Sequence, residues 1–333
     1  MIELFGITFD YTLRNVVFGA AILGIVGGVI GCLAVLRQQS LLSDAVSHAA
    51  LPGICVAFLA TGVRSTPILM AGAAVTGLLG ALLVLGLVRS TRLREDAALG
   101  IVLSTFFGFG TVLLTRISRT GDADQAGLSS FLFGQAASLV ATDVVAMAVL
   151  GTITLVVVAV AFKEFKASTF DPGFAASIGL PVTGLSILLT LLIVSAIVIG
   201  LQAVGVILMV TVLVAPALAA RQWTTDLGRM MILAGFLGGA SGITGALLSA
   251  TVSRLPTGPT IVLIASAIVI VSVLFAPGRG VAWGAAERRR TGRRVRAEWA
   301  DRAERHQLPG GNDHLAPQSS GRLPAPVAEG SGR

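Results

Sequence analysis

Residues 182–200 read VTGLSILLTLLIVSAIVIG, a run without a single charged side chain. A helix of about 20 apolar residues crosses the hydrocarbon core of a bilayer. Because no water reaches the backbone there, a helix that bonds its own amides and carbonyls is the simplest structure for such a run. Similar runs recur along the chain, so the sequence predicts an all-α polytopic membrane protein.

The composition supports this class for the whole chain. Hydrophobic residues make up 54% and charged residues 12% of the 333 residues, against about 25% charged residues in soluble domains. No soluble domain is evident, and we expect residues 1–280 to form one transmembrane domain of eight or nine helices. The nine spans that the pattern favours are 15–36, 41–60, 67–88, 97–116, 139–162, 182–200, 202–220, 229–252 and 258–276.

Two segments fit this scheme less well than the others. Residues 41–60 contain Asp44, His48 and Pro52, which predicts a polar helix with a bend at the proline. Residues 127–138 (GLSSFLFGQAAS) are too short to cross a bilayer and are predicted to be re-entrant or interfacial.

Basic residues predict the orientation, because loops on the cytoplasmic side of a membrane carry an excess of Lys and Arg. With the N-terminus outside and the C-terminus inside, the inner loops hold the larger set of basic residues before the tail is counted. That inner set is Arg37, Arg89, Arg92, Arg94, Lys163, Lys166, Arg221 and Arg229, against Arg14, Arg64, Arg116, Arg119 and Arg254 outside.

The C-terminal segment 281–333 differs from the rest of the chain. It begins with a basic cluster that includes Arg288–Arg290, and beyond about residue 308 it is rich in Pro, Gly, Ser and Gln. We expect a cytoplasmic and largely disordered tail, since it has little to bury. Arginines just past the last span suit contact with anionic membrane lipid, so no nucleic-acid partner is predicted.

Asp44 and His48 lie four residues apart inside the predicted span 41–60. On a helix, residues at i and i+4 share a face. Placing an aspartate at bilayer depth costs about 2.5–3.5 kcal/mol or more, a cost usually offset by a partner, a proton or a metal. His48 is also the only histidine outside the C-terminal tail. The pair is therefore the strongest candidate for a functional site.

Two interpretations of this pair stay open on the residues alone. In the first, Ser43 or Asp44 caps the start of the helix and His48 bonds to a neighbouring helix. In the second, carboxylate and imidazole are ligands for a divalent metal such as Mn, Zn or Fe. Two ligands are too few for a tight site, but a two-fold dimer with this helix at its axis would supply four. Ser47 and Cys55 could then line the path.

Residues 163–181 form the largest internal loop between predicted spans. Phe170–Gly173 (FDPG) predicts a turn followed by a short helix with Pro172 near its first position. Phe170, Phe174 and Ile178 recur at i, i+4 and i+8 and would give one apolar face. Such a face fits a groove on a partner protein or the membrane interface.

The sequence lacks the motifs of two other classes of protein and leaves one alternative open. An intramembrane hydrolase would need a nucleophile with a base or a metal triad, yet the chain contains neither HExxH nor GxSxG. A secondary transporter or channel driven by an ion gradient needs only one intramembrane acid, and it remains the alternative. The chain also lacks the GxxxxGK[ST] phosphate-binding loop, so it is not expected to bind ATP in that manner.

SLLSDAVSHAALPG (40–53) resembles the second-helix motif of the ABC-3 family, the membrane permeases of bacterial ABC importers for manganese, zinc or iron. The resemblance covers about residues 10–280 and leaves out the basic tail. Further segments that match the family in order are REDAALGIVLSTFFGFGTVLL (94–114), KEFKASTFDPGFAASIGLPV (163–182), VGVILMVTVLVAPALAARQW (204–223) and GGASGITGALLSATVSRLPTGPTIVLIAS (238–266).

This resemblance implies a homodimeric permease in the bacterial plasma membrane, similar in fold to the membrane subunit of the vitamin B12 importer. It implies no enzymatic activity and no permanently bound cofactor, with Mn, Zn or Fe as the transported ion. An ABC ATPase dimer on the cytoplasmic side and an extracytoplasmic metal-binding protein are the implied partners. Asp44 and His48 would gate and coordinate the metal, and the residues implied to contact the ATPase are Phe170, Asp171, Pro172, Phe174, Ile178 and Gly179.

Overall fold

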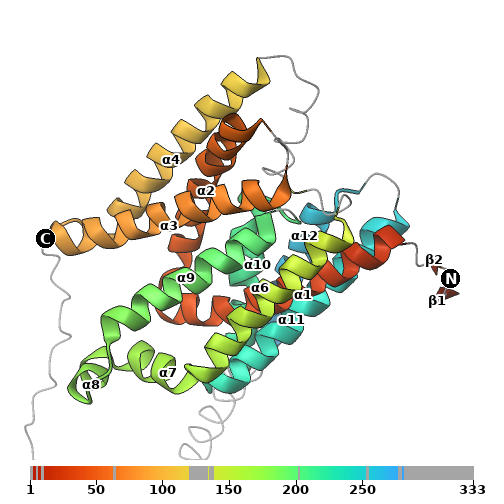
Figure 1. Cartoon of the computed structure of the whole chain (residues 1–333). Helices are drawn as coiled ribbons and strands as arrows, with labels where there is room; N and C mark the ends of the chain where they lie inside the picture. The colour runs from red at the N-terminus through yellow and green to blue at the C-terminus, as the bar shows by residue number, and fades with distance from the viewer. Residues whose placement is uncertain are drawn as a thin grey trace, which may run out of the picture. The chain divides into compact units, whose positions relative to one another are not determined.

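The computed structural model describes residues 3–4, 7–8, 11–62, 65–119, 134, 139–201, 203–252, 255–276 and 280. A two-stranded antiparallel hairpin, β1 (Glu3–Leu4) with β2 (Ile7–Thr8), precedes the first helix. The other described elements are all helices (Figure 1): α1 (Tyr11–Leu36), α2 (Ser40–Thr61), α3 (Thr66–Ser90), α4 (Glu95–Ser118), α6 (Ala141–Val160), α7 (Phe162–Phe170), α8 (Pro172–Ser177), α9 (Val182–Leu201), α10 (Val206–Trp223), α11 (Leu227–Thr251) and α12 (Thr257–Phe275).

Within the described part of the chain, nine helices are long and apolar enough to cross a membrane. They are all the helices except the short α7 and α8, and each coincides with one predicted span. The prediction of an all-α protein with about nine spans is therefore confirmed. Helix α2 continues as one α-helix through Pro52.

The predicted and observed helix boundaries differ before α10. The sequence predicts a span from residue 202, whereas α10 begins at Val206. Gly205 has φ +85° and ψ 167°, a backbone conformation that is open essentially only to glycine. The break between α9 and α10 therefore extends to Gly205, beyond the boundary at residue 201 that the predicted spans imply.

Helix α1 is held by close contact between backbones. A Cβ atom added to Gly24 would overlap the carbonyl oxygen of Gly238 on α11, and one on Gly28 would overlap that of Ala234. Two turns after Gly24, on nearly the same face of α1, a Cβ atom on Gly31 would overlap the carbonyl oxygen of Leu213 on α10. Small residues let membrane helices approach in this way, and they place α1 in the centre of a group with α10 and α11.

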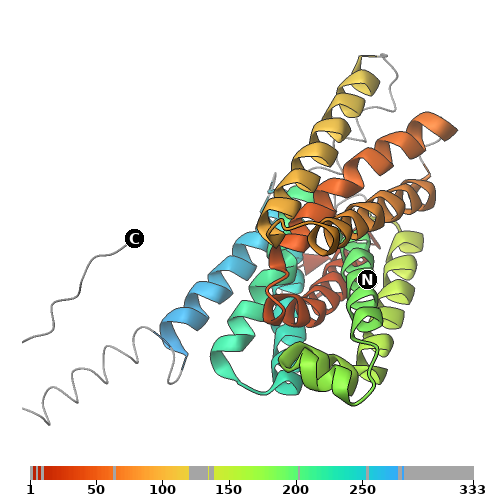
Figure 2. The same ribbon diagram turned by 90° about the vertical axis from the view of Figure 1, so that its left-hand side faces the viewer.

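Helices α2, α3 and α4 form a second packed group, visible together in Figures 1 and 2. Gly53 of α2 and Gly72 of α3 face each other so closely that a side chain on either would strike the other backbone. This second group meets the first where α2 packs on α10 and α9, and where α3 packs on α9. Helix α2, which carries Asp44 and His48, therefore links the second group to α10 of the first.

Two sequence predictions fall outside the described residues. Of the segment 127–138, only Gly134 is described, and it lies close against Ala203 and Val204 at the break before α10. The tail 281–333 is not described at all.

The glycine contact between α1 and α11 makes a stability prediction. Gly238→Ala would force the two helices apart, and overpacking of this kind costs about 1–3 kcal/mol. Gly86→Ala on α3 is the matched control, because nothing lies within 4 Å of an added Cβ there and both changes gain the same helix propensity. Thermal unfolding in detergent should show a lower midpoint for Gly238→Ala than for the control, and equal midpoints would contradict the packing.

Candidate functional site

The start of α2 is set by a tight turn after α1. The amide of Gln39 donates to the carbonyl of Ala34 at 2.8 Å, and the amide of Gln38 donates to that of Val35 at 3.1 Å. Gln38 has φ +59°, so this is the Schellman arrangement in which one left-handed residue ends a helix. Helix α2 then begins at Ser40.

This start excludes the capping interpretation of the polar pair. The N-cap position of α2 is Gln39, which makes no side-chain capping bond, and no acidic residue lies in the first turn. The Ser43 hydroxyl donates to the carbonyl of Ser40 at 2.5 Å instead of accepting from an amide. Capping by Ser43 or Asp44 was therefore the wrong alternative, because the helix starts one turn earlier than that interpretation needs.

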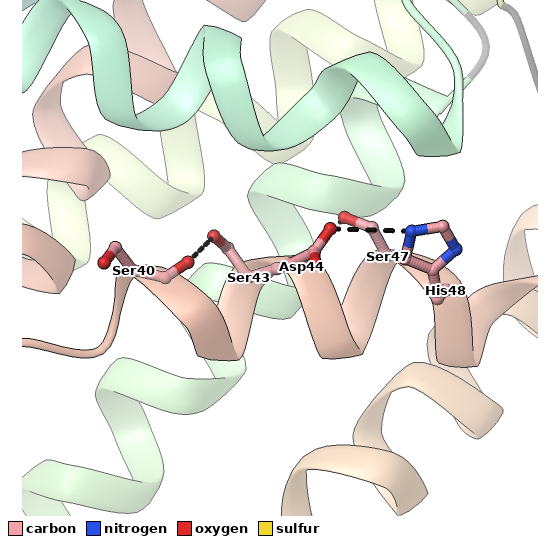
Figure 3. Close-up of polar contacts among 5 residues, drawn as sticks. All are labelled: Ser40, Ser43, Asp44, Ser47 and His48. Carbon is pink, nitrogen blue, oxygen red and sulfur yellow. Dashed lines mark hydrogen bonds and ion pairs between the residues drawn. The ribbon is translucent and has the colours of Figure 1, made fainter. Parts of the chain in front are cut away.

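Asp44 and His48 face each other on one side of α2 (Figure 3). The Nε2 atom of His48 lies 3.5 Å from Oδ1 of Asp44, and the side chains of His48 and Asp44 are 15% and 34% exposed. The separation is too long for a good hydrogen bond. In the single chain the Asp44 side chain is thus partly exposed, whereas the His48 side chain is mostly buried.

The His48 ring is oriented by a helix distant in sequence. It meets the ring of Phe107 on α4 edge to face, with centroids 4.8 Å apart and planes at 80°. Edge-to-face contact is a favoured geometry for aromatic rings. The other ring nitrogen, Nδ1, is buried and has no hydrogen-bond partner among the described residues. Phe107 and the turn of α2 thus hold Nε2 toward Asp44, a contact that the sequence analysis did not identify.

The distance between the two ligand atoms suits one metal ion. A metal at about 2.1 Å from both the imidazole nitrogen and the carboxylate oxygen would see them at about 110°, close to the tetrahedral angle. Among the described residues, no group of three or more His, Cys, Asp and Glu side chains is placed to hold a metal. Within the described residues, one chain therefore brings only these two donor atoms together here.

The two predicted path-lining residues are both buried within the chain. The Ser47 hydroxyl donates to the carbonyl of Ser43 at 2.7 Å. The Cys55 thiol lies between α2 and α4 and points at the carbonyl of Gly110, 3.8 Å away. Both side chains contribute to packing around the pair, and their exposure to a path remains a prediction. Asp143 accepts the amide of Val140 at 3.3 Å in the first turn of α6.

The loop 163–181 folds into α7 and α8. The turn motif predicts α8, whereas α7 was not predicted. Oδ1 of Asp171 accepts the amide of Phe174 at 2.8 Å and caps α8, and Pro172 opens that helix. Phe170, Phe174 and Ile178 are 59%, 57% and 55% exposed. The chain leaves this segment at Gly179, where φ is +85°. Three exposed apolar side chains thus lie outside the predicted spans. Phe170 ends α7 and Ile178 follows α8, so they do not share one continuous helix as the spacing predicts.

Residues 9–276 match the family model described as the ABC 3 transport family. Since the match covers most of the chain, this protein belongs to that family of transporter membrane proteins, and the resemblance seen in the sequence is confirmed.

Individual relatives agree with this placement. The chain is 48% identical over 281 residues to the zinc transport system membrane protein TroC of Treponema pallidum, covering 84% of this chain and 94% of that one. It is 48% identical over 283 residues to the manganese transport system membrane protein MntC of Bacillus subtilis, covering 85% of this chain and 65% of that one. Among solved structures, PsaBC from Streptococcus pneumoniae in complex with Fab has a TM-score of 0.72 at 30% identity, covering 81% of this chain and 94% of that one.

Proposed function

We propose that this protein is the membrane-spanning subunit of an ATP-driven importer for divalent transition-metal ions. The observation that carries the proposal is the Asp44–His48 pair, which holds an oxygen and a nitrogen ligand 3.5 Å apart inside a membrane domain. Oxygen and imidazole donors accept Mn, Zn and Fe alike. The named relatives transport zinc and manganese, so we favour these two ions over iron.

The site is completed in this proposal by a second copy of the chain. Two protein ligands leave a metal weakly held, and 34% of the Asp44 side chain is exposed within one chain. A two-fold axis beside α2 would bring together two carboxylates and two imidazoles around one ion. Four ligands from two chains can separate again when the subunits move, which suits a site that must release the ion it binds. Ser47 and Cys55 would support the walls of this path.

Energy for transport would come from a separate ABC ATPase dimer. The sequence contains no GxxxxGK[ST] loop, and the exposed apolar surface of Phe170, Phe174 and Ile178 supports a docking role for α8. An apolar face on a short helix binds in a groove of a partner. With the N-terminus outside, α8 lies on the cytoplasmic side, and an extracytoplasmic metal-binding protein would deliver the ion to the opposite side.

The alternative is a transporter driven by an ion gradient. Vesicles that contain this protein and its ATPase separate the two mechanisms, because only the importer needs ATP. Metal uptake that follows a proton or sodium gradient without the ATPase would contradict the proposal.

Loss of either metal ligand should stop transport. Asp44→Asn and His48→Ala each remove one ligand type from both chains of the dimer, so ATP-driven uptake of radioactive manganese or zinc should fall to background. Asp96→Asn is the matched control, because Asp96 is an exposed aspartate in the first turn of α4. Both ligand variants should still assemble with the ATPase, and normal uptake by either of them would remove that residue from the metal site.

A negative charge on α8 should uncouple ATP hydrolysis from metal transport. Phe174→Asp places a carboxylate in the middle of the apolar surface, and its desolvation on docking opposes a productive contact. Metal uptake per ATP hydrolysed should therefore fall. Val252→Asp also replaces an exposed apolar side chain by a carboxylate, at a 45% exposed position that follows the C-terminus of α11. Equal coupling ratios in the two variants would argue against docking through α8.

A further inference from the structure

Arg37, the residue that follows α1, bonds to three hydroxyl groups. Its Nη2 donates to Oγ of Ser168 at 2.6 Å, its Nε donates to Oγ1 of Thr169 at 3.1 Å, and its Nη1 donates to Oγ of Ser186 at 3.3 Å. All three partners are more than 130 residues away in sequence. In the sequence, Arg37 stands out only as one of the basic residues that predict orientation.

These partners lie on both sides of α8. Ser168 and Thr169 belong to the last turn of α7, and Ser186 belongs to the first turns of α9. The guanidinium group therefore bridges the helix that enters the α8 segment and the helix that leaves it. A displacement of α8 that also moves α7 or the start of α9 would therefore either stretch these hydrogen bonds or move Arg37 with them.

The acceptors are neutral, and among the described residues no carboxylate forms an ion pair with Arg37. Partial burial lowers the pKa of the guanidinium, which nevertheless stays protonated in proteins. A charged donor makes stronger hydrogen bonds than a neutral one. The planar fork of arginine can satisfy three acceptors at fixed angles, which a lysine ammonium cannot reproduce.

Arg37 is also the first residue of the turn that joins α1 to the metal-binding helix. Only Gln38 and Gln39 separate it from α2, and Gln38 holds the left-handed conformation of that turn. Asp44 follows in the second turn of α2. The glycine contacts hold α1 against α11 and α10. A displacement of this turn would therefore move the start of α2 and leave α1 in place.

We propose that Arg37 is a positioning residue that links the movement of α8 to the position of Asp44 and His48. When α8 shifts, the guanidinium carries the α1–α2 turn with it and changes the separation of the ligands from those of the second chain. This inference rests on the proposed function, since it assumes that α8 contacts an ATPase.

The test measures metal taken up per ATP hydrolysed in liposomes that contain the complete transporter. Arg37→Ala should lower this ratio by about tenfold, within the usual range of coupling between two sites, while ATP hydrolysis and assembly stay unchanged. Arg37→Lys keeps the charge but not the fork, so the ratio should stay low. Arg92→Ala, which removes an exposed arginine from the turn between α3 and α4, should behave like the unmodified protein.

A milder variant removes acceptors and leaves Arg37 in place. Thr169→Val combined with Ser186→Ala should lower the same ratio, and adding Arg37→Ala to this pair should lower it little further. An unchanged ratio in Arg37→Ala would overturn the inference, as would full activity in Arg37→Lys. A parallel loss of ATP hydrolysis, assembly and thermal stability in Arg37→Ala and the hydroxyl variant would assign Arg37 a structural role instead. Absence of ATP-driven uptake in the unmodified transporter would contradict the proposed function itself.

Discussion

The close approach of α1 to α11 and α10 is the contact on which the rest of this structure depends. In a membrane, helices gain little from burying apolar surface against one another, so tight van der Waals packing must hold them together. Gly24, Gly28 and Gly31 allow backbone contact along one helix with two neighbours. This contact gives a fixed framework, against which α2 and the loop that carries α8 can be positioned.

This framework positions Asp44 and His48 on α2, but within the described residues it supplies only these two side chains to the candidate metal site. Phe107 orients the imidazole, and the helix geometry sets the carboxylate opposite Nε2. No third potential ligand joins them among the residues that the structure describes. An oxygen and a nitrogen donor with open positions can bind a divalent ion transiently, which suits a transporter better than a storage or catalytic site. This incompleteness is the physical reason for proposing a dimer with the pair at its axis.

Much of the fold could be predicted from sequence because the relevant signals are local. Most membrane spans are continuous apolar runs, and the cap formed by Asp171 with Pro172 is contained within four residues. The features that escaped prediction depend on residues distant in the chain or on backbone conformation. Nothing in the local sequence shows that Phe107 meets His48 or that Arg37 meets Ser186. Likewise, the turn with left-handed Gln38 lets α2 begin at Ser40, earlier than a cap at Ser43 or Asp44 would require. The capping role predicted for these two residues is therefore absent.

The central claim is that two chains share one metal ion between their Asp44 and His48 side chains. The most direct measurement is the metal content and X-ray absorption spectrum of the purified dimer after loading with Mn²⁺ or Zn²⁺. The account predicts one ion for every two chains, with imidazole nitrogen and carboxylate oxygen as ligands, and loss of that ion in His48→Ala. One ion in each chain, or a bound ion whose spectrum is unchanged in His48→Ala, would contradict it.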